Sequence, residues 1–124
     1  MDILQGVKVL LLEDDFLINA ATADLLQEFG CEVTAVLDVR GALDALEEDR
    51  PQVAVLDINI RGEHSYPVAD RLHQLHIPIV FLTGYDVPAL EGPWSRYSVC
   101  RKPCDPALLR RFLTEALRTQ EDQA

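Results

Sequence analysis

The sequence predicts an α/β fold in which a parallel sheet is covered by helices on both faces. The chain has 124 residues, of which 48% are hydrophobic and 26% charged, and this composition is typical of one globular domain. Short apolar runs alternate with segments of helical spacing, in the order strand–helix repeated five times. Such alternation is typical of parallel strands joined by crossover helices. We therefore expect a single domain over residues 1–124.

Two strand–helix units occupy the first part of the chain. The continuous apolar run Val7–Leu12 predicts a strand buried on both faces. Helical spacing continues through residues 16–29, and Gly30 is a typical stop signal. The apolar positions expected on one side of this helix are Leu17, Ala20, Ala21, Leu25 and Phe29. Glu32–Leu37 predicts a weaker strand, after which Asp38 can cap a second helix.

Three further units follow, of which the fourth is irregular. The remaining strands are predicted at Val53–Leu56, Ile77–Leu82 and Ser98–Arg101. Pro67 suits the first turn of the third helix, and Asp105, followed by proline, suits the start of the last one. Prolines and a glycine interrupt Asp86–Arg96, so this segment can form at most a short helix. We expect residues 120–124 to be frayed.

Charge and cysteine content narrow the function classes. Lys plus Arg number 11 against 21 Asp plus Glu, and an acidic surface repels phosphate backbones, so nucleic acid is not an expected partner. Cys31, Cys100 and Cys104 lack CxxC spacing, which predicts free thiols in a reducing compartment rather than a disulfide framework or a zinc site. Neither a signal peptide nor a membrane-spanning run is recognisable, so we expect a cytoplasmic protein without membrane contact.

Polar residues follow four of the predicted strands. They are Glu13 and Asp14, then Asp57, Thr83 and Lys102. Because ligands bind at the carboxyl ends of strands in open α/β sheets, we expect these side chains to form one site. Each residue alone could be an ordinary surface or turn position, and their coincidence is the signal.

The chemistry of this set points to phosphoryl transfer. Neighbouring carboxylates need compensation of their charge, and Mg²⁺ prefers carboxylate, water and phosphate oxygens. Lys102 adds a positive charge and Thr83 a hydroxyl donor, which are parts found around a transferring phosphoryl group. Asp57 is the expected nucleophile and would form an aspartyl-phosphate. Gly84 would leave space for the phosphoryl group.

These motifs resemble the receiver domain of two-component response regulators. They are Leu12-Glu13-Asp14, Val55-Leu56-Asp57-Ile58-Asn59, Thr83-Gly84 and Lys102-Pro103, and the resemblance covers about residues 7–119. It implies a flavodoxin-like (βα)5 fold with strand order 2-1-3-4-5 and a short or mobile fourth helix. It also implies a stand-alone signalling module that catalyses only its own phosphorylation and dephosphorylation.

The resemblance gives each residue of the set a role. A histidine kinase or a histidine phosphotransfer protein would phosphorylate Asp57. The ligands of Mg²⁺ would be Glu13, Asp14, Asp57 and the backbone carbonyl of Asn59. Thr83 and Lys102 would bind phosphoryl oxygens, and the Lys102–Pro103 bond would be cis. Output would pass through contact with an unknown downstream protein or through diversion of phosphoryl groups.

Some positions depart from the family pattern. The family's switch aromatic, three residues before the lysine, is Val99 here, and we expect Tyr97 to face the same side only if a bulge intervenes. Cys104 stands where a phenylalanine often follows Lys-Pro, and we expect it to be an inert packing residue. These departures argue against the usual coupling between the threonine and an aromatic side chain.

The segment Phe81-Leu82-Thr83-Gly84-Tyr85 resembles the motif of a receiver subgroup known for single-domain proteins. That subgroup tends to work with HWE-type and related histidine kinases. Tyr85 would either gate access to the phosphoryl group or cover the core, and Asn59 could tune hydrolysis. We also expect phosphorylation to order residues 86–96.

Two other functions stay open on the residues alone. A small aspartate-nucleophile phosphatase of the haloacid dehalogenase type would place a second aspartate where this chain has Asn59, and would carry a cap segment. An interaction module that ignores phosphorylation would not need the carboxylates, the threonine and the lysine. The receiver hypothesis explains more of the sequence than either.

Overall fold

The computed structural model describes residues 2–60, 62–84 and 97–123. Its main sheet consists of β1 (Lys8–Leu12), β2 (Glu32–Val36), β3 (Val53–Asp57), β6 (Ile79–Thr83) and β7 (Ser98–Arg101). The helices of these segments are α1 (Phe16–Glu28), α2 (Val39–Glu48), α3 (Tyr66–Gln74) and α4 (Pro106–Gln123). The segment 86–96, for which at most a short helix is predicted, lies outside the described residues, as does Tyr85.

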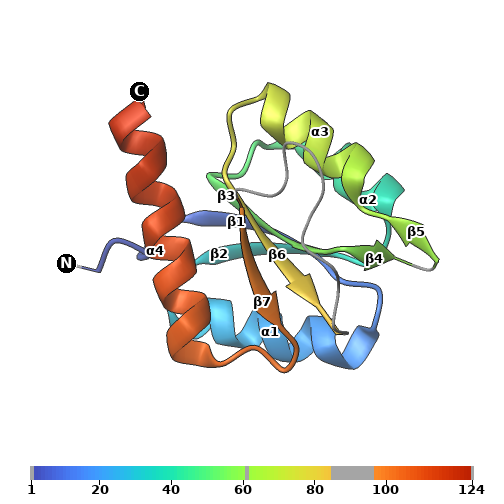
Figure 1. Ribbon diagram of the computed structural model, residues 1–124, viewed down its shortest axis with the longest axis horizontal. Helices are drawn as coiled ribbons and strands as arrows, with labels where there is room; N and C mark the ends of the chain where they lie inside the picture. Colours follow the sequence, from blue (N-terminus) through green and yellow to red (C-terminus); the bar gives the residue numbers. More distant parts are fainter. Residues whose placement is uncertain (1, 61, 85–96, 124) are drawn as a thin grey trace.

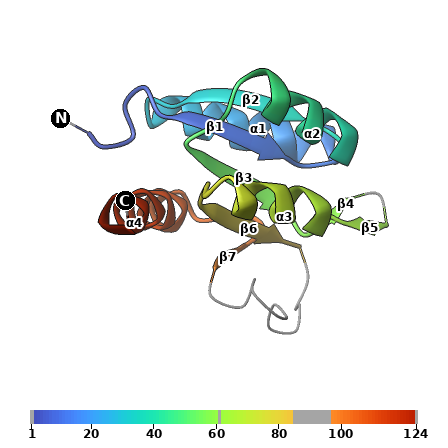
Figure 2. The same ribbon diagram turned by 90° about the horizontal axis from the view of Figure 1, so that it is seen from above.

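The strands are all parallel and pair in the order β2-β1-β3-β6-β7. Counted along the chain, this is the order 2-1-3-4-5. The helices α2 and α3 cover one face of the sheet, and α1 and α4 cover the other (Figures 1 and 2). The predicted flavodoxin-like fold class and strand order are confirmed.

The core is split into two clusters because successive strand residues face opposite sides of the sheet. In β1, Leu10 and Leu12 face α2 and α3, whereas Val9 and Leu11 face α1 and α4. All residues of β3 and β6 are buried, which is why both appear in the sequence as continuous apolar runs. Full burial of a leucine side chain in this core, relative to leaving it exposed to water, contributes about 1.5–3 kcal/mol to the free energy of unfolding.

Aspartates cap three of the helices. Asp15 accepts hydrogen bonds from the backbone N–H groups of the second and third residues of α1, at 3.0 Å each. Asp38 accepts one from Gly41 at 2.6 Å at the start of α2. Asp105 accepts one from Leu108 at 3.2 Å at the start of α4. The predicted caps at Asp38 and Asp105 are confirmed, and α4 continues to Gln123, beyond its predicted end.

The predicted apolar face of α1 is correct at Leu25 and Phe29, which pack against the core, but wrong at its other three positions. Leu17 is 77% exposed, and Ala20 and Ala21 are also exposed. The buried residues of α1 are Asn19 and Leu26, seven positions apart on the same side of the helix. The inward face therefore carries a polar residue at its centre, and apolar spacing alone selected the neighbouring face.

A short hairpin after β3 is absent from the sequence-based prediction. Its strands are β4 (Asn59–Ile60) and β5 (Glu63–His64), which pair antiparallel with Asn59 opposite His64. Gly62, at φ 83°, lies in the two-residue connection between them. A glycine in a two-residue connection is the usual hairpin signal, but the flanking strands are too short to show alternation.

The expectation about Tyr97 is also wrong. The β6–β7 ladder pairs residue with residue, Phe81 with Val99 and Leu82 with Cys100, so no bulge intervenes in it. Tyr97 nevertheless packs on the α2/α3 side, edge-on to Phe81 at 6.0 Å between ring centroids. Residues two apart share a face in a regular strand, so Tyr97 lies on the side of Val99 without a bulge.

Two of the cysteines are not free thiols, contrary to the prediction. A disulfide joins Cys100 to Cys104, and Cys31 is a buried free thiol. The turn after β7, which includes the cis Lys102–Pro103 bond, brings the Cα atoms of Cys100 and Cys104 to 5.8 Å. This distance lies in the usual range for a disulfide. Spacing along the sequence did not reveal it because the turn creates the approach.

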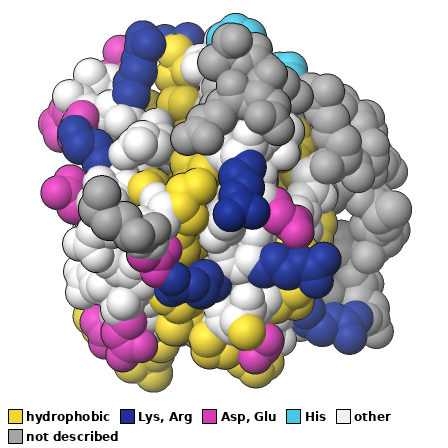
Figure 3. Space-filling model, turned by 90° about the vertical axis from the view of Figure 1, so that its left-hand side faces the viewer, with side chains coloured by type: hydrophobic (Ala, Val, Ile, Leu, Met, Phe, Trp, Pro, Cys, Tyr) yellow, Lys and Arg dark blue, Asp and Glu magenta, His cyan; other side chains and the backbone are white. Residues whose placement is uncertain are grey.

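Charges of both signs mix on the face shown in Figure 3. On α4, Arg111 pairs with Glu115 at 3.0 Å, and Arg110 pairs with Asp2 near the N-terminus. Arg110 also lies over the ring of Phe29 at 5.3 Å. Among the described residues, no helix combines the length and the apolarity that crossing a membrane would require.

Candidate functional site

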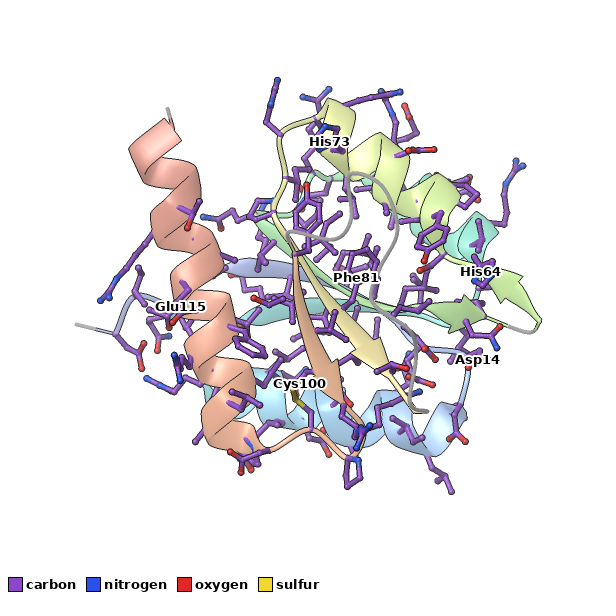
Figure 4. All side chains as sticks on the ribbon, viewed as in Figure 1. Asp14, His64, His73, Phe81, Cys100 and Glu115 are labelled. Atoms are coloured by element: carbon purple, nitrogen blue, oxygen red, sulfur yellow. A yellow bond between two sulfur atoms is a disulfide. The ribbon has the colours of Figure 1, made fainter. Side chains whose placement is uncertain are left out.

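The predicted site residues meet at one edge of the sheet. They follow or end adjacent strands: Glu13 and Asp14 after β1, Asp57 at the end of β3, Thr83 at the end of β6 and Lys102 after β7. All five line one cavity of about 790 Å³. Figure 4 shows Asp14 at this edge, in the turn from β1 to α1. Side chains 89 positions apart in the sequence therefore come into direct contact.

Glu13, Asp14 and Asp57 form what we call the acidic group. One oxygen from each of the three carboxylates lies within 4.8 Å of the others. Glu13 is fully buried, Asp57 is 4% exposed and Asp14 is partly exposed. Carboxylates this close repel one another, and a hard divalent cation relieves the repulsion through oxygen ligands. The donor set fits a metal ion such as Mg²⁺.

Lys102 holds two members of the acidic group at once. Its Nζ donates hydrogen bonds to Glu13 Oε2 at 2.8 Å and to Asp57 Oδ2 at 2.9 Å. Its side chain is only 14% exposed, so water screens these contacts weakly. Burial lowers the pKa of Lys102, but the two hydrogen bonds and the two carboxylate charges outweigh it and raise the pKa above 10.5. Lys102 is therefore a cation at neutral pH.

The pKa of Glu13 is also displaced. Burial raises it above 4.5, and the charge of Asp57 raises it further. Hydrogen bonds from Lys102 and from the backbone N–H of Asp15, the latter at 3.1 Å, offset only part of this effect. The single ammonium group of Lys102 thus does not fully neutralise the negative charge of the acidic group, and a bound cation would stabilise it further.

Neighbouring backbone contacts fix these side chains. The N–H of Lys102 donates to the carbonyl of Thr83 at 2.7 Å, which ties the start of the last turn to β6. The N–H of Asn59 donates to Asp57 Oδ1 at 3.3 Å. Asn19 Nδ2 donates to the carbonyls of Glu13 and Val36 at 3.0 Å each, which anchors α1 beside the site. Sequence reasoning missed this role of Asn19, although a polar residue on the buried side of a helix is a usable signal.

The phosphoryl-binding candidates border the cavity. Thr83 is 6% exposed. Gly84 is exposed, and a Cβ placed on it would lie 3.6 Å from Lys102 Cε, so the lysine stem passes directly beside it. Asn59 is exposed on β4 and also lines the cavity. Tyr85, the other candidate modulator, lies outside the described residues.

The cavity has an apolar wall that the sequence did not predict. It is lined by Ile18, Leu25, Leu109, Pro103 and Cys104, with His64 from the hairpin. These residues come from α1, α4, the last turn and β5. Pro103 belongs to the predicted Lys102-Pro103 motif, but nothing in the local sequence marks the others as site residues. His64 stacks on Tyr66 with 5.2 Å between ring centroids. The wall arises from the packing of elements rather than from a motif.

Comparisons with known proteins agree with this geometry. Residues 9–92 match the family model of the response regulator receiver domain. The chain is 33% identical over 116 residues to the transcriptional regulatory protein CseB of Streptomyces coelicolor, covering 89% of this chain and 49% of that protein. It is 26% identical over 121 residues to the sensory transduction protein LytT of Bacillus subtilis, covering 94% and 50% respectively.

A solved structure gives the same result. The N-terminal domain of a response regulator/sensory box/GGDEF 3-domain protein from Carboxydothermus hydrogenoformans superposes with a TM-score of 0.82 at 25% identity, covering 94% of this chain and 98% of that domain. The chain spans about half the length of the curated relatives LytT and CseB. The chain belongs to the response regulator receiver domain family.

Proposed function

We propose that the chain accepts a phosphoryl group on Asp57 from a histidine kinase or a histidine phosphotransfer protein in a Mg²⁺-dependent phosphorelay. The observation that carries this proposal is the pairing of buried Asp57 with Lys102 inside an acidic group that calls for a cation. Receiver domains are phosphoacceptor signalling modules, and the family match does not favour the phosphatase or the phosphorylation-independent alternative.

In the transfer step, a carboxylate oxygen of Asp57 forms a bond to phosphorus while the bond from phosphorus to the donor histidine nitrogen breaks. The electron pair of the broken bond stays on the imidazole nitrogen. Lys102 Nζ, now shared between Glu13 and Asp57, lies close enough to turn to a phosphoryl oxygen, and the Thr83 hydroxyl would donate to another. Gly84 keeps the space beside the lysine stem free of a side chain.

Glu13, Asp14 and Asp57, with the backbone carbonyl of Asn59, would hold Mg²⁺, which supplies positive charge to the phosphoryl oxygens when bound. The carboxylates of the acidic group would otherwise repel an incoming phosphoryl anion. Loss of the group to water ends the signal, and exposed Asn59 lies where it can influence the attacking water. Tyr85 is the second proposed modulator.

The donor would approach beside α1. Phe16 and Leu17, at the start of this helix, are 71% and 77% exposed, and the next residue, Ile18, lines the site cavity. Exposed apolar side chains next to the phosphoacceptor suit contact with a protein donor. We further propose that the donor is an HWE-type kinase, because the Phe81-Leu82-Thr83-Gly84-Tyr85 segment resembles the motif of the receiver subgroup that works with such kinases. We also propose that the protein acts in the cytoplasm, where ATP is available to the kinase. Output through protein contact or phosphate diversion remains part of it.

Phosphotransfer from a radiolabelled histidine kinase in the presence of Mg²⁺ tests the proposal. Wild type should become labelled, and Asp57→Asn should not, because an amide cannot act as the nucleophile. Asp70→Asn, an exposed aspartate on α3, is the matched control and should be labelled like wild type. Equal labelling of Asp57→Asn, or no labelling of wild type by any kinase of the host, would overturn the proposal.

A further inference from the structure

The turn between β7 and α4 carries a cysteine on each side of Lys102. The disulfide between Cys100 and Cys104 closes a ring that contains Arg101, Lys102 and Pro103 (Figure 4). Lys102 is the middle residue of this ring, and its Nζ contacts Glu13 at 2.8 Å and Asp57 at 2.9 Å. The disulfide therefore constrains the very segment that presents the lysine to the phosphoacceptor.

The two sulfur atoms differ in accessibility. Cys100 is 1% exposed and packs in the cluster beneath α1 and α4. Cys104 is partly exposed and lines the same cavity as Asp57. A thiol that enters from solvent can therefore approach Cys104, whereas Cys100 is shielded. Cys31, the remaining cysteine, is 6% exposed and is not part of the disulfide.

We propose that Cys100 and Cys104 form a thiol–disulfide modification site that controls how Lys102 is held against Asp57. The proposal rests on the phosphoacceptor function proposed above. Its reductant is a low-molecular-weight thiol of the glutathione type, and its oxidant is the corresponding disulfide. The site responds to the thiol balance of its surroundings independently of any kinase.

The exchange proceeds in two steps. A thiolate attacks Cys104 Sγ, the protein S–S bond breaks, and Cys100 leaves as a thiolate that takes up a proton. A second thiolate attacks the sulfur of the bound reagent in the mixed disulfide, which releases Cys104 as a thiol and the reagent as its disulfide. Two reagent thiols are oxidised while one protein disulfide is reduced, and oxidation runs through the same steps in reverse.

The dithiol form would hold Lys102 less firmly. The backbone bond from Lys102 to Thr83 anchors the start of the segment at 2.7 Å in β-sheet fashion, but the residues up to Cys104 lose their covalent closure. Lys102 must then be positioned against the phosphoryl group during the transfer itself, which raises the barrier of that step. We expect the disulfide form to accept phosphoryl groups at least about threefold faster, because small misplacements of a positioning group lower rates strongly.

A redox titration of the full chain tests the modification site without phosphorylation. The protein is equilibrated in buffers of varied glutathione to glutathione disulfide ratio, alkylated, and analysed by intact mass. Two alkylated thiols should appear together across one transition, and peptide mapping should assign them to Cys100 and Cys104. A disulfide that persists in the most reducing buffer, or that never forms in the most oxidising one, would overturn the proposal.

Phosphotransfer rates of the oxidised and reduced protein, measured with Mg²⁺ and one phosphodonor, test the coupling. Cys104→Ala should accept at the reduced rate in both buffers, while Cys31→Ala should keep the wild-type redox response. Equal rates for oxidised and reduced wild type, or a response retained in Cys104→Ala, would contradict the coupling. If neither form accepts phosphoryl groups, the proposed function and the coupling both fail, and the titration still decides whether the pair is redox-active.

Discussion

At the residue scale, the balance of charge around Lys102 dominates the site. Its ammonium group contacts Glu13 and Asp57, and Asp14 adds a further carboxylate within 4.8 Å of them. The buried carboxylates lose hydration that one ammonium group does not replace, and the raised pKa of Glu13 expresses this deficit. The site therefore stores electrostatic repulsion that a cation or a neutral side chain relieves.

Glu13→Gln should stabilise the protein in Mg²⁺-free buffer. Asp15 N–H and Lys102 Nζ bond different oxygens of Glu13, so the amide oxygen can keep only one of these two hydrogen bonds. The amide nevertheless carries no charge in this fully buried position, and we expect the loss of the charge to outweigh the loss of one bond. We expect the free energy of unfolding in urea to rise by roughly 1 kcal/mol, the usual scale of a point substitution. Glu32→Gln, an exposed glutamate on β2, is the control and should change little. A clear loss of stability in Glu13→Gln would contradict this account.

The same residues predict a pH dependence. Because the pKa of Glu13 is raised above 4.5, its contribution to stability is fully present below 4.5 and is lost as the pH rises through the folded-state pKa. Lys102, whose pKa is raised above 10.5, contributes fully below 10.5 and loses its contribution only above that. The advantage of Glu13→Gln over wild type should therefore shrink between neutral pH and 4.5 in urea unfolding. An advantage that does not vary with pH would show that Glu13 is not its source.

Mg²⁺ should stabilise the folded chain. A ligand that binds the folded state alone adds about 2.7 kcal/mol at 100 times its dissociation constant, which a thermal shift detects. Asp14→Asn should lose most of this response, because it removes a charged oxygen donor from the acidic group. Asp15→Asn is the matched neighbour, since asparagine also caps helices, and it should keep the response. A response of equal size in Asp14→Asn would exclude this carboxylate as a ligand.

At the element scale, Asn19 connects α1 to the site edge of the sheet. Its amide bonds two backbone carbonyls at 3.0 Å, one of them that of Glu13. Asn19→Ala should lower the free energy of unfolding in urea by about 1–3 kcal/mol, because the buried carbonyl of Glu13 loses this donor. The carbonyl of Val36 keeps the N–H of Glu13, at 3.2 Å. Asp24→Ala, an exposed position of the same helix, should stay near wild type. Equal changes in the free energy of unfolding for the two substitutions would show that Asn19 does not anchor α1.

The elements differ in how well the sequence predicts them. The strands β1, β3 and β6 are predictable because burial on both faces demands continuous apolar residues. The inward face of α1 is not, since its central buried residue is the polar Asn19. The hairpin of β4 and β5 is too short to produce a pattern. Periodicity detects long, uniformly buried elements and misses those set by a single polar contact or a tight turn.

At the scale of the whole molecule, topology assembles the site. Parallel strands in the order β2-β1-β3-β6-β7 bring Glu13, Asp57 and Lys102 to one edge, which is why strand-end residues predicted their meeting. The Cys100–Cys104 disulfide and the apolar cavity wall depend instead on the last turn and on helix packing. Because both arise from contacts between elements in the folded chain, no spacing in the sequence predicted them.

The position of the phosphoryl group on the chain decides whether Asp57 is the phosphoacceptor. After phosphotransfer with Mg²⁺, borohydride reduction converts an aspartyl-phosphate to homoserine, and peptide mass spectrometry identifies the modified position. We expect homoserine at position 57 in wild type and no modified peptide in Asp57→Asn. Modification at another aspartate, with position 57 intact, would contradict it.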